Sequence, residues 1–152
     1  MPASYLFTSQ DEITAQLKGI KWNGDTIKVY DGQFDDDELF KIAEAQEGNV
    51  PFIVTNFSGE LQAPIRMHGI VGAAKDTTQT MFTVQVVYTN SRITRQVMDQ
   101  INQKIKGFAP TGCGEVNVGF YASPGKINAL GTPTRYSAVQ SYSYYVNSNA
   151  IC

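Results

Sequence analysis

His68 is the only histidine in the 152-residue chain, so any catalytic group built on an imidazole must include it. A serine or cysteine nucleophile needs such a base beside it, and the serine of many hydrolases occupies a Gly-x-Ser-x-Gly turn. The sequence contains no such turn. We therefore interpret His68 as a surface or loop residue and expect no catalytic residues.

Residues that could bind metal or phosphate lack the spacing that such sites need. Zinc sites favour closely spaced cysteine and histidine ligands, whereas Cys113 and Cys152 stand far apart. The acidic run at 35–38 lacks the residue order of an EF-hand loop, and the glycines around Cys113 lack that of a phosphate loop. The paired carboxylates of a glycosidase have no local motif and so cannot be sought by spacing. However, no acidic residue here stands alone in an apolar run, where burial would shift its pKa for catalysis. We expect neither a metal nor a cofactor.

Composition places the chain among folded proteins that do not bind nucleic acid tightly. Hydrophobic residues make up 42% and charged residues 17%, with a formal net charge of −2. Disordered chains combine low hydrophobicity with high net charge, and DNA-binding domains usually carry a basic surface. No apolar run reaches the roughly 18–20 residues that cross a bilayer, and residues 1–10 do not resemble a signal peptide. We expect one cytoplasmic globular domain over residues 1–152, with free thiols favoured over a disulfide.

The strongest local pattern is a strand followed directly by a helix. From Thr80 to Tyr88 one set of alternating residues is apolar and the other mixed, as in a strand covered mainly on one face. Residues 89–91 offer capping side chains, and Gly107 is a natural helix end. Between them, apolar residues recur at helical spacing and predict a helix over 92–106. These residues are Ile93, Val97, Ile101 and Ile105.

Weaker patterns predict the remaining elements. Ser9 and Glu12 have the spacing of a capping box, which predicts a helix from about Gln10 to Gly19. The acidic run at 35–38 favours the start of a short helix that ends near Gln46. Turn residues at 123–125 separate the last two strands. Of the remaining predicted strands, the second follows Pro51, and the third is a weak edge strand. These five predicted strands span residues 26–30, 52–57, 66–71, 116–121 and 135–147.

This order of elements predicts an α+β fold. We expect a mostly antiparallel sheet of four to five strands, with the two main helices packed on one face. The last strand, over 135–147, is longer than most and rich in tyrosine and serine.

The polar and aromatic residues left over suit contacts between subunits. Two arginines are candidates for ion pairs across an interface, although they also fit an ordinary surface. The loop tip at 72–78 either reaches a neighbouring subunit or stays a surface loop. Tyrosine is enriched at interfaces, so the last strand offers further candidates, with core or edge packing as the alternative. The interface candidates are Arg66, Lys75, Asp76, Arg135, Tyr142 and Tyr144.

The order and length of these elements resemble the tail terminator, or tail completion, proteins of long-tailed bacteriophages. The likeness extends from Asp11 to Val146, and only the acidic stretch Asp35–Gln46 falls where a plain loop is expected. That family has no motif for its functional residues, so none is transferred. The segments that carry the likeness are the first helix, Val29-Tyr30-Asp31-Gly32, Pro51-Phe52-Ile53-Val54, Met81–Tyr88 running into Arg92–Lys106, and Tyr136–Val146.

The resemblance implies a single tail-terminator-like domain that forms a homo-oligomeric ring, hexameric in that family, at the head-proximal end of a tail. Such a ring stops polymerisation of the tail tube, and of the sheath in contractile tails. It presents a surface to the head–tail connector or neck proteins. The resemblance also implies a virion protein assembled in the host cytoplasm, with DNA passing through the lumen without specific binding and no membrane contact.

Two alternatives remain open at this point. One is a head-completion or neck adaptor, or a subunit similar to those of the tail tube. The other, from a different class, is a small-ligand-binding or enzymatic α+β domain with a pocket beneath Trp22 and the tyrosines.

Overall fold

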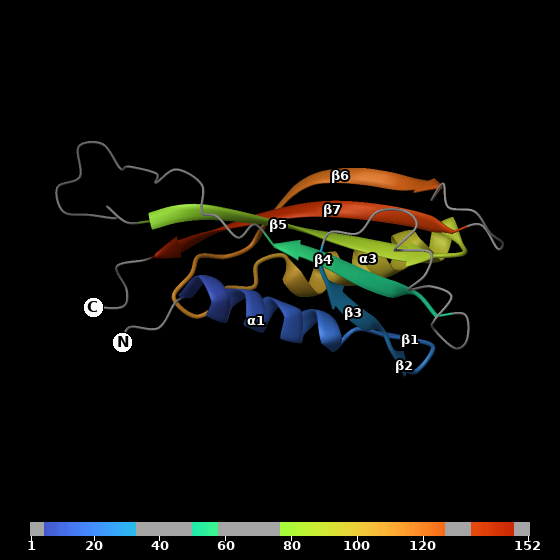
Figure 1. Ribbon diagram of the computed structural model, residues 1–152, viewed down its shortest axis with the longest axis horizontal. Helices are drawn as coiled ribbons and strands as arrows, with labels where there is room; N and C mark the ends of the chain where they lie inside the picture. The colour runs from blue at the N-terminus through green and yellow to red at the C-terminus, as the bar shows by residue number, and fades with distance from the viewer. Residues whose placement is uncertain (1–4, 33–49, 58–76, 127–134, 148–152) are drawn as a thin grey trace.

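The computed structural model describes residues 5–32, 50–57, 77–126 and 135–147 (Figure 1). The predicted short helix at 35–46, the edge strand at 66–71, and His68 and Cys152 lie outside these residues. The described elements, in chain order, are α1 (Tyr5–Lys18), β1 (Lys21–Trp22), β2 (Asp25–Thr26), β3 (Lys28–Asp31), β4 (Phe52–Phe57), β5 (Thr77–Tyr88), α3 (Ser91–Ile105), β6 (Asn117–Lys126) and β7 (Tyr136–Asn147).

The main sheet has five strands in the order β3-β4-β5-β7-β6. Strand β3 pairs with β4 in parallel, and the other neighbours are antiparallel. Both helices pack on one face of this mixed sheet, which confirms the predicted α+β class (Figure 1). A separate hairpin joins β1 and β2 through Asn23 and Gly24, which both have positive φ. Such turns favour asparagine followed by glycine because glycine tolerates positive φ at no steric cost.

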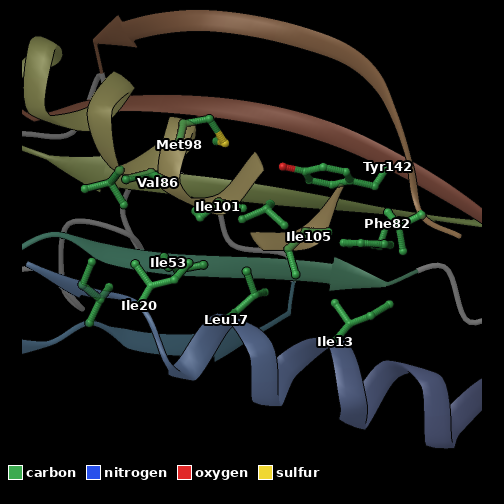
Figure 2. Close-up of a cluster of buried hydrophobic side chains, with 14 of the residues drawn as sticks. Ile13, Leu17, Ile20, Ile53, Phe82, Val86, Met98, Ile101, Ile105 and Tyr142 are labelled. Atoms are coloured by element: carbon green, nitrogen blue, oxygen red, sulfur yellow. The ribbon is translucent and has the colours of Figure 1, made fainter. Parts of the chain in front are cut away.

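The core lies between the sheet and the two helices. The register aligns Ile53, Val86 and Ala138 across three neighbouring strands, so their side chains share the face that the helices cover. Figure 2 shows Ile13 and Leu17 of α1 pointing toward this face. A fully buried aliphatic side chain contributes about 1.5–3 kcal/mol relative to an exposed one, so this cluster is the main stabilising element.

The predicted strand and helix at the centre of the chain are confirmed. Helix α3 begins after Asn90, whose side-chain oxygen accepts hydrogen bonds from the backbone N–H groups of Arg92 at 2.9 Å and Ile93 at 3.1 Å. These bonds satisfy two of the donors that the first helical turn leaves without partners. The chain leaves the helix through Gly107, at a φ of 81° that glycine adopts readily.

The predicted capping box at the start of the first helix is wrong. Helix α1 already begins at Tyr5, and Ser9 lies inside it with a buried side chain. Glu12 instead accepts hydrogen bonds from the backbone N–H and the hydroxyl of Thr111, both at 2.7 Å. The two acceptor oxygens of one carboxylate therefore join α1 to the loop before β6.

The predicted turn at 123–125 is also wrong, because β6 continues through it to Lys126. Two residues, 123 and 124, stand opposite the single residue Ala138 of β7, since Ala122 pairs with Val139 and Gly125 with Ser137. Serine, proline and glycine here mark a β-bulge, which admits proline within a strand.

Candidate functional site

The predicted interface residues have different positions in the fold. Arg66, Lys75 and Asp76 lie outside the described residues. Arg135 is half-buried immediately before β7. The prediction is wrong for Tyr142 and Tyr144, because both side chains are buried on the helix-covered face of the sheet. The alternation along β7 puts the two tyrosines on the same face of the strand, and this face packs in the core.

The two tyrosines are polar members of this core. The Tyr142 ring stacks on Phe82 with ring centroids 5.0 Å apart, and its hydroxyl donates to Asn102 Oδ1 of α3. Burial raises the pKa of Tyr142 above its ordinary value. Burial also raises the pKa of Tyr144 to about 12, although its hydrogen bond with Ser9 acts in the opposite direction. Neither phenol is therefore poised to act as an acid or base near neutral pH.

Cys113 is a potential nucleophile in the loop before β6. Burial raises the pKa of its thiol, and the Glu12 carboxylate raises it further, against the lowering effect of a hydrogen bond with Ser9. A reactive cysteine needs a depressed pKa, because the thiolate is the nucleophile. We interpret Cys113 as a packing residue of the loop before β6.

Two classes of site are absent from the part of the chain that the structure describes. Within it, no three His, Cys, Asp or Glu side chains form a group that could hold a metal ion. No helix there is long and apolar enough to span a membrane.

An exposed apolar surface lies along β6, the outer strand of the sheet (Figure 1). We define the β6 edge surface by Val118, Phe120 and Tyr121, and Phe120 has 78% of its surface exposed. The first bulge of β6 places residues 119 and 120 opposite Ser141 alone. Bulges re-aim side chains and disrupt pairing, so this edge presents a large aromatic ring to solvent.

The buried side chain of Gln140 holds this bulge in place. Its Nε2 group lies 2.9 Å from the carbonyl oxygen of Gly119 and 3.0 Å from that of Phe120. Ser141 Oγ adds a bond of 3.1 Å to the same Phe120 oxygen. Hydrogen bonds from β7 therefore hold the backbone of Gly119 and Phe120 in the bulge.

A second surface feature is a groove of about 580 Å³ between the β1–β2 hairpin and α3. Trp22 lines it from the hairpin, while α3 contributes charged and amide side chains at helical spacing. The α3 residues that line it are Arg92, Arg95, Gln96, Asp99, Gln100 and Gln103.

Sequence reasoning missed the β6 edge surface. The alternation of Val116, Val118 and Phe120 predicts a strand but does not reveal a bulge, because a bulge depends on the register with β7. No protein-family model and no curated protein sequence matches the chain. Any proposed function therefore rests on the sequence resemblance and on these two surfaces.

Proposed function

We propose that the chain is a structural subunit of a ring that caps the head-proximal end of a bacteriophage tail. The ring is hexameric in the family that the sequence resembles. It stops polymerisation of the tail tube and of any sheath, and it provides the surface to which head or neck proteins attach. DNA passes through its lumen without specific binding.

The β6 edge surface is the observation that best supports an assembly role. A large exposed aromatic side chain on an edge strand favours association with another protein chain. Folded proteins that stay monomeric commonly protect such edges. Here the buried Gln140 amide donates to the backbone carbonyl group of Phe120, whose side chain is exposed. The described order of helix, strands and a long strand leading into a helix also agrees with the segments that carry the resemblance.

Light scattering and electron microscopy test the proposal. We expect the purified protein, alone or with tail tubes, to form closed rings, and labelled protein to lie at the head-proximal end of intact particles. Label at another position in the particle favours a neck adaptor or a tail-tube-like subunit. A protein that stays monomeric and never associates with tails contradicts the proposal.

A matched pair of variants tests the role of the edge surface. Phe120→Ser should reduce assembly without changing the circular dichroism spectrum, because the side chain packs little within the subunit. Phe7→Ser on α1 is the control, since Phe7 is also exposed, at 61% of its surface, but lies far from β6 in the sequence. Equal assembly of the two variants removes the support that this surface gives.

A small-ligand-binding domain is the second candidate, and the Trp22 groove favours it. A groove that combines an aromatic wall with convergent polar groups has the character of a ligand site. A thermal-shift screen tests this candidate. One metabolite class that raises the melting temperature in a saturable way supports it.

A further inference from the structure

The described lining of the groove between Trp22 and α3 holds two arginines and one acidic residue. Arg92 and Arg95 are exposed and lie one turn apart on α3. Neither guanidinium makes a hydrogen bond or ion pair within the described part of the chain. The one acid of the groove, Asp99, is engaged, because its carboxylate accepts from Gln103 Nε2 at 3.0 Å. Two guanidinium groups therefore remain available to an external anion.

The chain contains a segment of the opposite charge. Residues 31–47 hold seven of the 14 acidic residues and one basic residue, Lys41. Four of the acids are consecutive, Asp35 to Glu38. By contrast, residues 91–106 hold four basic residues and one acid. Two sequence stretches of opposite charge on one chain are compatible with a head-to-tail interface between identical subunits.

We propose that this groove binds the acidic run Asp35–Glu38 of a second copy of the chain. Arg92 and Arg95 bind its carboxylates, a pairing that the planar guanidinium makes with two parallel hydrogen bonds. Trp22 forms the opposite wall and is positioned to contact apolar residues beside the acidic run. The inference rests on the proposed self-assembly, and it adds the site through which neighbouring subunits contact each other.

A nucleic-acid backbone fits the groove less well. Tight phosphate binding uses many basic residues and is favoured by a basic protein, whereas this chain has a net charge of −2. A short acidic peptide needs only the two arginines.

A synthetic peptide of residues 33–47 tests the site directly. The peptide carries a dye for anisotropy and contains no tryptophan, while Trp22 is the only tryptophan of the chain. We expect saturable anisotropy on addition of the full-length protein, a change in Trp22 emission, and at least fivefold weaker binding when salt rises from 50 to 500 mM (on the order expected from screening of exposed charges). A peptide with Asn and Gln in place of the four acids should not bind.

Variants locate the binding to the groove. Arg92→Glu with Arg95→Glu should abolish peptide binding. Lys104→Glu with Lys106→Glu is the control, because it reverses two charges on or beside the same helix but outside the groove lining. Absence of peptide binding, equal binding of the neutral peptide, or preferential saturation of the groove by duplex DNA overturns the inference.

Sedimentation separates this inference from the ring itself. The arginine double variant and a variant with lysine at 35–37 should each assemble poorly, whereas their mixture should assemble, because each provides the charge that the other lost. Rings that form equally well with the arginine variant overturn the inference and leave the proposed function intact. Peptide binding by a protein that never forms rings supports the groove as the binding site of the acidic run and contradicts the proposed ring.

Discussion

The hydroxyl groups of Ser9 in α1 and Tyr144 in β7 lie 2.7 Å apart in the core, although 135 residues separate them in the chain. Both side chains are buried. A buried hydroxyl without a partner costs free energy, so this pair fixes the position of α1 against the sheet more specifically than apolar contacts alone.

Removal of either hydroxyl should destabilise the protein. We expect Ser9→Ala and Tyr144→Phe each to lower the free energy of unfolding by about 1–2 kcal/mol, because each removes the buried hydrogen bond between the two hydroxyl groups. The double variant should cost less than the sum of the two, since both single variants remove the same hydrogen bond. Urea denaturation of the four proteins measures this coupling. Strict additivity would contradict a direct interaction.

Stability should fall at alkaline pH because of Tyr144. Its pKa rises from the ordinary value of 10.0 to about 12 in the folded protein, so the folded state keeps a proton that the unfolded state releases. The stabilisation is fully present below pH 10 and is lost between pH 10 and 12, at up to about 1.4 kcal/mol per pH unit. Urea denaturation at intervals across this range should show a shallower loss for Tyr144→Phe than for the wild type. Identical pH dependence of both proteins would show that this phenol does not titrate as described.

Gln140→Leu should loosen the β6 bulge. The variant keeps the size of the side chain but removes the donor to the carbonyl oxygens of Gly119 and Phe120. We expect a loss of about 1–3 kcal/mol of stability and faster hydrogen exchange in β6 than in β5. Exchange that speeds up equally in both strands would indicate general destabilisation in place of a local effect.

Asn90→Ala should cost about 1 kcal/mol of stability, because it removes the acceptor for two backbone N–H groups of α3. Asn90→Asp keeps an acceptor at the same position and should retain most of the stability. Thermal denaturation of the two variants provides the comparison. Equal melting temperatures would mean that water replaces the cap at no cost.

The central part of the fold could be predicted because its signals are local. The alternation in β5, the stripe on α3 and the cap at Asn90 are all contained within about thirty consecutive residues. The prediction of a capping box was wrong for the opposite reason, because the partners of its two side chains are not local. The motif at Ser9 and Glu12 is real in sequence, but Tyr144 and Thr111 bind those side chains from distant parts of the chain.

The surfaces were harder to predict because they depend on register and on which face is covered. The alternation of β7 separates Tyr142 and Tyr144 from the neighbouring serines, yet it does not indicate which set contacts the helices. The exposure of Phe120 follows from a bulge that is visible only when β6 and β7 are aligned. Of the groove, the sequence pointed to Trp22, and only the fold brings the polar side chains of α3 beside it.

Strand β7 follows β6 in the chain but lies between β5 and β6 in the sheet. During synthesis, β6 can therefore reach its final place only after β7 has left the ribosome, whereas β5 can already pair with β4. Until then, a nascent chain that already includes Phe120 exposes an unpaired β6, the edge of β5 that later pairs with β7, and an incomplete core. We expect the domain to fold late and as one unit, so chains interrupted before β7 should be targets for chaperones and proteases.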